Sequence, residues 1–227
     1  KIKFVRIVRS FYLLQVIYQL PANAASLFVG QQVDGHNFVT EAINLGAKFA
    51  LVSRPVSEPH ILVADTGKAL IDLAIYIRSK LPELKIVGIT GSQGKTTSKE
   101  FLHSILKLEG ETVATAGNFN TDIGVPLTLL RCNEQTKFCI LEMGARHSGD
   151  IAKLTKIAKP NVGVVLVVGT AHIGEFGSVE AIAKTKAELI INLPANSTAV
   201  LGSYDAYTPK MADSLELKKV LFGDNQN

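Results

Sequence analysis

The chain has 227 residues, of which 47% are hydrophobic and 19% charged, and it carries a formal net charge of +4. This length allows one large domain or two small ones, and the composition is typical of globular proteins. The positive excess suits small anions such as nucleotides. It is too small to indicate nucleic-acid binding, because no run of Lys and Arg with interleaved aromatic residues accompanies it. Cys132 and Cys139 lack metal-ligand spacing, and we interpret them as reduced thiols of a cytosolic protein.

The N-terminus resembles a secretion signal. Four basic residues precede an apolar stretch over residues 11–17, and residues 22–24 imitate a signal-peptidase site. However, Gln15 and Gln19 interrupt the apolar pattern, and the stretch is too short to span a bilayer. We therefore expect no signal peptide, no membrane insertion and a cytoplasmic location. Because the chain begins with Lys1 rather than Met, we expect it to be an incomplete natural product.

The first part of the chain predicts a small αβ domain over residues 1–83, whose first 26 residues are atypical. Its boundary is a weak one near Pro82. The expected strands are 27–30, 49–52 and 61–63, and the expected helices are 37–45 and 68–80.

The second part, residues 84–227, alternates more clearly between strands and helices. This alternation predicts an α/β domain with a mostly parallel sheet flanked by helices. The expected strands are 85–90, 138–141, 162–168 and 198–201, and the expected helices are 97–109, 151–158 and 179–191. In the first of these helices, Phe101, Leu102, Ile105 and Leu106 form one apolar face.

A glycine-rich segment between the strand 85–90 and the following helix predicts a phosphate-binding loop. Backbone N–H groups at the helix start attract phosphate, Lys95 can bridge the β- and γ-phosphates, and Thr96 can bind magnesium. The loop has the form G-x-x-G-K-T, since Ile89 occupies the place of the first glycine of the longer pattern. A plain glycine-rich turn is the alternative. The expected ATP-binding residues are Gly91, Ser92, Gln93, Gly94, Lys95, Thr96 and Thr97.

Two further polar residues follow predicted strands, at the sheet edge where ligands bind in open α/β folds. Glu142 ends the strand 138–141, and His172 follows the valine-rich strand. Taken alone, each could be an ordinary surface or loop residue. Beside a phosphate loop, a carboxylate and an imidazole indicate a magnesium site.

Lys186 lies on the apolar stripe of the helix 179–191, whereas Lys184 projects elsewhere and is expected to be solvated. A lysine on a buried face is costly unless it is paired or neutral. One interpretation is that Lys186 extends to solvent or pairs with a nearby acid. The functional interpretation is an amine kept reactive, or modified into a metal-binding anion.

Four motifs together resemble the Mur ligase family, and within it the branch that adds D-alanyl-D-alanine. The similarity runs from about residue 27 to about residue 201 and is strongest after Gly88. The motifs are GITGSQGKTT (88–97), GNFNTDIGVP (117–126), EMGARHSGDI (142–151) and AHIGEFGS followed by AKTK (171–178 and 183–186).

The resemblance implies an ATP- and Mg²⁺-dependent ligase of peptidoglycan precursor synthesis, and hence a role in cell-wall formation, cell shape and division. ATP would phosphorylate the carboxylate of UDP-N-acetylmuramoyl tripeptide, and D-alanyl-D-alanine would attack the acyl phosphate. It implies a monomer with catalytic residues Lys95, Glu142, His172 and Lys186. Thr96, Glu142, His172 and carbamylated Lys186 would bind metal, Asn120 would bind ATP, and Asn118, Arg146 and His147 would bind substrate.

The chain departs from the family in three segments. The uridine-recognition segment is not recognisable before Leu27, and the loop 30–36 is shorter. A late Asn-x-Asp-Asp run appears as Gly202-Ser203-Tyr204-Asp205. The chain also ends before the family's C-terminal domain, so we expect little ligase activity from it alone.

Two alternatives remain open on the sequence. One is a sister ligase that adds glutamate to folate or another amino acid to the muramoyl peptide, which the run 117–126 disfavours. The other is a truncated, non-catalytic paralogue that only binds nucleotide or a partner.

Overall fold

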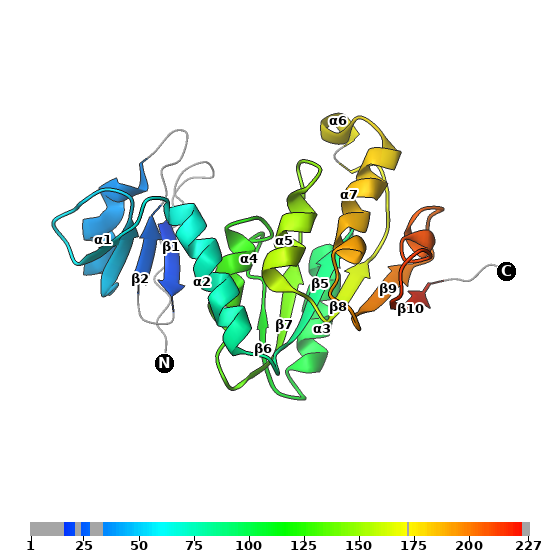
Figure 1. The fold of residues 1–227 in the computed structure, drawn as a ribbon, viewed down its shortest axis with the longest axis horizontal. Coiled ribbons are helices and arrows are strands. Elements are labelled where there is room, and N and C mark those ends of the chain that lie inside the picture. The colour runs from blue at the N-terminus through cyan, green and yellow to red at the C-terminus, as the bar shows by residue number, and fades with distance from the viewer. Residues whose placement is uncertain (1–15, 21–23, 28–33, 172, 224–227) are drawn as a thin grey trace. The chain divides into compact units, whose positions relative to one another are not determined.

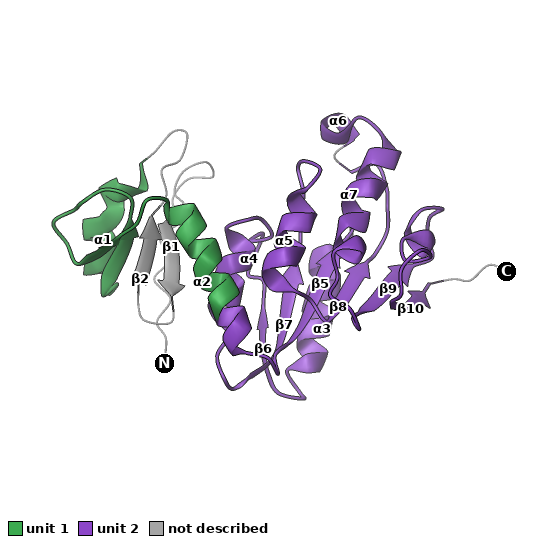
Figure 2. Ribbon diagram, in the orientation of Figure 1, with its two compact units in different colours: residues 1–76 green, residues 77–227 purple. Residues whose placement is uncertain are grey.

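The computed structural model describes residues 16–20, 24–27, 34–171 and 173–223. The chain divides into two compact units, residues 1–76 and 77–227, which are described separately (Figure 2). This division falls within helix α2 (Thr66–Lys80), a few residues before the domain boundary expected at 83/84. The N-terminal segment that resembles a signal peptide lies largely outside the described residues.

Unit 1 contains a four-stranded sheet in the order β1-β2-β3-β4. β1 (Val16–Leu20) and β2 (Ala24–Leu27) are antiparallel, whereas β3 (Phe49–Val52) and β4 (His60–Leu62) continue the sheet in parallel. The expected helix 37–45 is confirmed as a short 3₁₀ segment, η1 (Gly35–Phe38), followed by α1 (Val39–Asn44). The expected strand 27–30 lies outside the described residues except for Leu27. Val39 and Ala42 of α1 pack with Ala50 and Val52 of β3.

Unit 2 is built on a six-stranded parallel sheet in the order β10-β9-β8-β5-β7-β6, which confirms the predicted fold class. Its strands are β5 (Lys85–Thr90), β6 (Glu111–Ala114), β7 (Thr136–Glu142), β8 (Val162–Val165), β9 (Thr198–Gly202) and β10 (Lys218–Phe222). Its further helices are α3 (Lys95–Leu106), α4 (Gly124–Leu129), α5 (Asp150–Ala158), α6 (Ile173–Phe176), α7 (Val179–Ile191) and the 3₁₀ turn η2 (Thr208–Lys210). The sequence patterns did not predict β6, α4 or β10.

The strand order sets where ligands can enter. β5 lies between β7 and β8, and Figure 1 shows α4, α5 and α7 on one face of the sheet and α3 on the other. Right-handed crossovers require this arrangement, because the chain runs outward from β5 to β6 and then reverses, returning through β7 and on to β8 and β9. The carboxyl ends of β5, β7 and β8 therefore meet beside the point where the strand order reverses, which is the usual ligand crevice of such sheets.

The valine-rich strand is shorter than expected, since β8 ends at Val165 rather than at residue 168. After Val165 the backbone stays beside β5 at Leu166 and reaches the phosphate loop at Val167. Leu166 N donates to Thr90 O at 3.0 Å, and Ser92 N donates to Val167 O at 2.8 Å. An apolar run could not reveal the contact of Val167 with Ser92, because backbone atoms make it.

The expected apolar face of α3 is only half correct. Leu102 and Leu106 are partly buried, but Phe101 and Ile105 are 68% and 60% exposed. The helix turns Lys99 inward instead, and its side chain is almost fully buried. Lys99, Leu102 and Leu106 share one side of a helix, so the buried stripe is rotated from the one that hydrophobicity alone predicts.

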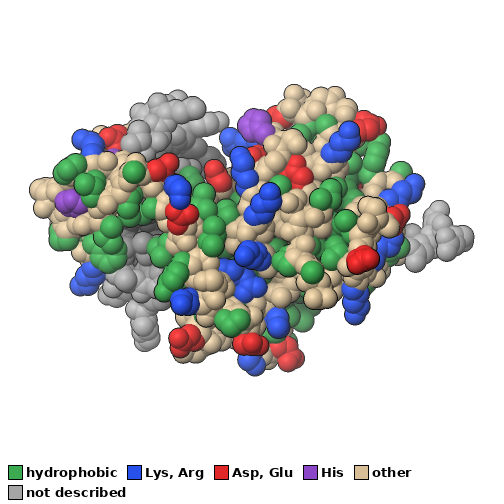
Figure 3. Space-filling view, viewed as in Figure 1, with side chains coloured by type: hydrophobic (Ala, Val, Ile, Leu, Met, Phe, Trp, Pro, Cys, Tyr) green, Lys and Arg blue, Asp and Glu red, His purple; other side chains and the backbone are tan. Residues whose placement is uncertain are grey.

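Within the described parts of the chain, no helix has the length and apolar character needed to cross a bilayer. On the face shown in Figure 3, Lys and Arg side chains alternate with Asp and Glu rather than forming one continuous basic surface. This distribution agrees with the small net charge of +4.

A close backbone approach fixes Gly202 at the end of β9. A Cβ atom added there would lie 2.0 Å from the carbonyl oxygen of Leu166, on the segment that leaves β8. Backbone atoms cannot rotate away, so a side chain at this position must push the strands apart.

We expect Gly202→Ala to lower the free energy of unfolding by about 1–3 kcal/mol, the usual cost of overpacking. The matched control is Gly174→Ala, because a Cβ atom at Gly174 would have no other atom within 4 Å. Urea unfolding followed by circular dichroism measures both variants. Equal midpoints for the two would contradict the close approach of Gly202 to Leu166.

Candidate functional site

The phosphate loop joins β5 directly to α3. Gly94 is the N-cap of α3, with a φ of 82° that lies in the left-handed region and favours glycine. This turn directs the first N–H groups of the helix to the end of β5, where the helix dipole favours an anion. The Lys95 ammonium lies back over the loop and donates to the Gly91 carbonyl at 2.8 Å. The predicted loop geometry is therefore present, with Lys95 at its centre.

Ser92 connects the loop to the segment after β8. Its hydroxyl accepts from Gly169 N at 2.8 Å, and its own N–H donates to Val167 O at 2.8 Å. Since these contacts already use the Ser92 hydroxyl and N–H, this residue holds the loop in place rather than offering both groups to phosphate. Gln93 is exposed beside it, and so is Thr97 at the start of α3.

Glu142 is a buried carboxylate at the end of β7, only 3% exposed. One oxygen accepts from the Thr96 hydroxyl at 2.9 Å, and the other accepts from the Asn120 amide at 2.9 Å. Thr96 and Glu142, which the resemblance assigns to the same metal, are thus in direct contact. Asn120 contacts Glu142, and its binding of ATP, which the resemblance implies, stays a prediction; Asn118 lies exposed two residues earlier.

The oxygen atoms of Thr96 and Glu142 fit a magnesium ion. Mg²⁺ prefers oxygen ligands and is usually bound by one or two carboxylates together with substrate phosphates. The phosphate loop next to these two side chains would supply the remaining charge. Among the residues that the structure describes, no three His, Cys, Asp or Glu side chains gather around one point. His172 lies outside the described residues, so its predicted place at the metal remains a prediction.

Lys186 on α7 is half-buried, whereas Lys184 is exposed, as the helical phase predicts. Burial, and to a smaller extent the positive charge of Lys95, lower the pKa of the Lys186 amine to about 8. Burial also lowers the pKa of Lys95, although the charge of Glu142 opposes that shift. The charge of Lys95 thus acts on the Lys186 amine. Because its pKa is lowered, the amine of Lys186 has a larger neutral fraction at neutral pH than the amine of an exposed lysine.

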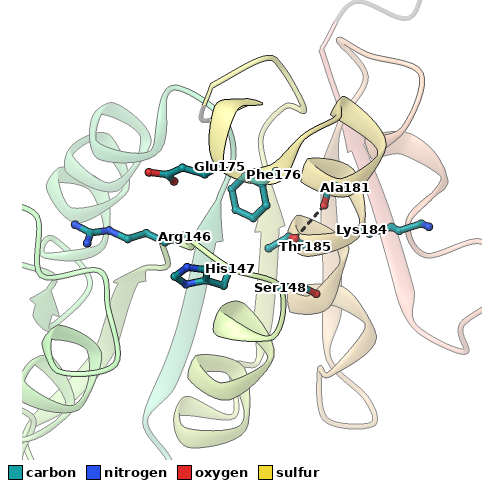
Figure 4. Close-up of a pocket in the computed structure, with 8 residues that line it drawn as sticks. All are labelled: Arg146, His147, Ser148, Glu175, Phe176, Ala181, Lys184 and Thr185. Atoms are coloured by element: carbon teal, nitrogen blue, oxygen red, sulfur yellow. Dashed lines mark hydrogen bonds between the residues drawn. The ribbon is translucent and has the colours of Figure 1, made fainter.

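Arg146 and His147 lie in the exposed loop before α5. Their backbone N–H groups donate to the Asp150 carboxylate at 3.0 and 2.9 Å. The loop borders an open pocket of about 300 Å³. In Figure 4, His147, Phe176 and Thr185 face the pocket, while Arg146 and Lys184 extend away from it on opposite sides. The pocket lining is Arg146, His147, Ser148, Glu175, Phe176, Ala181, Lys184 and Thr185.

Glu188 is a positioning residue that the sequence analysis missed. From α7 it accepts from Gly149 N at 2.6 Å and Ala152 N at 3.0 Å, so it caps the start of α5. It thereby fixes the helix of Lys186 to the loop of Arg146 and His147. Local capping rules could not identify it, because Glu188 lies 39 residues from Gly149 along the chain.

Asp205 supports the segment after β8 in a similar way. Its carboxylate accepts from Val168 N at 2.9 Å and from the Thr208 hydroxyl at 2.6 Å. Burial raises the pKa of Asp205, but the hydrogen bonds from Thr208 and Val168 lower it overall. The spacing of Asp205 and Thr208 is a recognisable turn signal, but the long-range contact to Val168 is not.

Comparison with known proteins places this geometry in a family. Residues 89–227 match the family described as the Mur ligase middle domain. An Escherichia coli K12 protein named UDP-N-acetylmuramoyl-tripeptide–D-alanyl-D-alanine ligase is 40% identical over 176 residues, which cover 77% of this chain and 39% of that protein. The chain thus spans about two fifths of the length of this curated relative.

Solved structures agree. A crystal structure of MurF from Acinetobacter baumannii has a TM-score of 0.81 at 35% identity, covering 92% of this chain and 48% of that one. MurF from Thermotoga maritima, solved in complex with ADP, has a TM-score of 0.75 at 36% identity, and the match covers 89% of this chain and 47% of that one. The chain therefore belongs to the Mur ligase family.

Proposed function

We propose that this chain is the ATP-binding part of a cytoplasmic MurF-type ligase of peptidoglycan precursor synthesis. The reaction joins D-alanyl-D-alanine to UDP-N-acetylmuramoyl tripeptide through an acyl phosphate and yields ADP and phosphate. The observation that carries this proposal is the half-buried Lys186, whose amine interacts electrostatically with Lys95 of the phosphate loop. A general nucleotide hydrolase has no need of a second, less basic amine at that place.

The nucleotide phosphates would bind at the start of α3, with Lys95 turning from the Gly91 carbonyl to the anion. Thr96 and Glu142 would hold Mg²⁺, which neutralises phosphate charge when bound. The similar protein from Thermotoga maritima was solved in complex with ADP, which supports nucleotide binding by this chain. Gly91, Ser92, Gln93, Gly94 and Thr97 complete the loop.

Lys186 would act as a carbamate. The neutral amine attacks carbon dioxide, a C–N bond forms, and the amine proton passes to water, which leaves a carbamate anion. Burial favours this step, because it lowers the pKa of Lys186 and so raises the neutral fraction. The product anion also replaces the repulsion between two cations with an attraction to Lys95.

The peptide substrate would lie on the side of the site formed by Asn118, Arg146 and His147, all of which are exposed. Arg146 offers a planar donor for a carboxylate or phosphate of UDP-N-acetylmuramoyl tripeptide. ATP and the peptide substrate would thus meet between the phosphate loop and α7. The enzyme would act as a monomer.

The role of Lys95 predicts a loss of ATP affinity in Lys95→Met. The variant removes a charged donor, so we expect the affinity to fall by about tenfold or more. Calorimetric titration of the chain with ATP and Mg²⁺ measures it. Lys107→Met is the matched control, because Lys107 is exposed at the other end of the same helix. Equal affinities of the two variants would contradict the role of Lys95.

Carbamylation predicts a ¹³C-carbamate signal when the chain is incubated with ¹³C-bicarbonate. The signal should increase as the pH rises through about 8, because Lys186 is protonated below that pH and neutral above it. Nuclear magnetic resonance detects the signal. It should disappear in Lys186→Ala and persist in Lys184→Ala, whose side chain is exposed. Loss of the signal in Lys184→Ala alone would show that the wrong lysine has been assigned.

The proposed substrates predict which amine is used by the polypeptide that contains this chain. With ATP, Mg²⁺ and UDP-N-acetylmuramoyl tripeptide, phosphate release should require D-alanyl-D-alanine, and glutamate should not replace it. Release that depends on another amine would instead indicate a sister ligase. Release without any amine would indicate a nucleotide hydrolase.

A further inference from the structure

Lys99 is a buried lysine that the proposed reaction does not use. It lies on α3 and is 1% exposed, so its side chain does not reach solvent. The ammonium donates to the Thr115 carbonyl at 2.7 Å and pairs with the Glu100 carboxylate at 2.8 Å. An ammonium group withdrawn from water costs several kcal/mol unless partners compensate, and an apolar side chain would often serve packing equally well. The position therefore calls for an explanation other than filling space.

The partner of Lys99 is itself connected to Glu142. Thr115 follows β6 directly, and its N–H donates to Ile140 O at 2.9 Å. Its hydroxyl accepts from Glu142 N at 3.0 Å. The carbonyl of Thr115 thus binds Lys99 while its hydroxyl holds the backbone of Glu142. Thr115 therefore connects α3 to the end of β7 through hydrogen bonds to Lys99 and to the backbone of Glu142.

Helix α3 reaches Glu142 by two routes. Thr96 contacts the carboxylate directly at 2.9 Å, and Lys99, three residues later, acts on its backbone through Thr115. Residues three apart lie on the same side of a helix, so both contacts depend on the same orientation of α3. Five residues beyond Thr115, the Asn120 amide holds the second oxygen of Glu142. A shift of Thr115 would move both the backbone of Glu142 and the start of the segment that carries Asn120.

We propose that Lys99 is a positioning residue that holds Glu142 in register with Thr96, so that the phosphate-loop helix and the strand-end carboxylate present their oxygens together to Mg²⁺. The inference rests on the proposed nucleotide and Mg²⁺ site. Lys99 touches neither nucleotide nor metal; it acts through Thr115. Residues that orient metal ligands in this way typically change metal affinity by about 10–100-fold when they are removed.

The experiment measures how strongly Mg²⁺ tightens ADP binding, as the ratio of the ADP dissociation constants without and with Mg²⁺. In Lys99→Met, which keeps the length but removes the ammonium, we expect this ratio to fall by about tenfold. The ADP affinity without Mg²⁺ should stay within about twofold of the unaltered chain, because the phosphate loop itself is unchanged. Lys107→Met, on the exposed end of the same helix, should keep the ratio.

A second variant keeps the test decisive if Lys99→Met folds poorly. Thr115→Val removes the hydroxyl that accepts from Glu142 N but leaves the carbonyl that binds Lys99. Thr115→Val should lower the ratio of the ADP dissociation constants without and with Mg²⁺ by about as much as Lys99→Met does. The double variant should lose no more than either single one, because both changes interrupt one connection.

Three results would overturn the role of Lys99. An unchanged ratio in Lys99→Met, an equal loss of ADP affinity with and without Mg²⁺, or fully additive losses in the double variant each contradict it. If the unaltered chain binds ADP with no effect of Mg²⁺, the proposed metal site fails and the role of Lys99 fails with it. Failure of the metal site can be told apart from failure of the role of Lys99, because the unaltered chain alone already shows whether Mg²⁺ affects ADP binding.

Discussion

The buried carboxylate of Glu142 is the constraint on which the rest of the site depends. A carboxylate that is 3% exposed must be supplied with donors, since an unpaired buried charge is severely destabilising. Its donors come from separate parts of the chain, Thr96 at the start of α3 and Asn120 in the loop after β6. The parallel sheet brings these segments together, because β5 and β7 are neighbours and end at the same edge. Satisfying one carboxylate thereby fixes the phosphate loop relative to its neighbouring strand.

Three lysines of unit 2, Lys95, Lys99 and Lys186, have three different environments, and their differences suit different tasks. Lys99 is buried and paired with the Thr115 carbonyl and Glu100. Lys95 lies over the phosphate loop, and Lys186 is half-buried near its positive charge. Because the amines of Lys95 and Lys186 repel each other when both are protonated, a negative charge placed near them would be stabilised. A polyphosphate at the loop, or a carbamate on α7, would each supply it, so the electrostatics favour an anion without specifying a hydrolytic reaction.

Several elements could be predicted from the sequence because the signals are local. β3 and β5 match the expected ranges residue for residue, since apolar runs between breaking residues define them. The helical period likewise separated the half-buried Lys186 from the exposed Lys184. The inward turn of Lys99 could not be predicted, because its stabilising partner is a carbonyl 16 residues away. The capping of α5 by Glu188 and the contact of Asn120 with Glu142 depend in the same way on partners that only the tertiary fold brings close.

Long-range hydrogen bonds also explain how the run 202–205, which differs from the family pattern, can still support the segment beside the phosphate loop. The phosphate loop is held by Ser92 against Gly169, and the Val168 N–H beside it is held by Asp205. Asp205 lies in the run where this chain departs from the family pattern that its motifs otherwise resemble. Only a carboxylate at that point is needed to accept from Val168 and Thr208, and the chain retains one. Although the run 202–205 differs from the family pattern, Asp205 still holds the Val168 N–H beside the segment that contacts the phosphate loop.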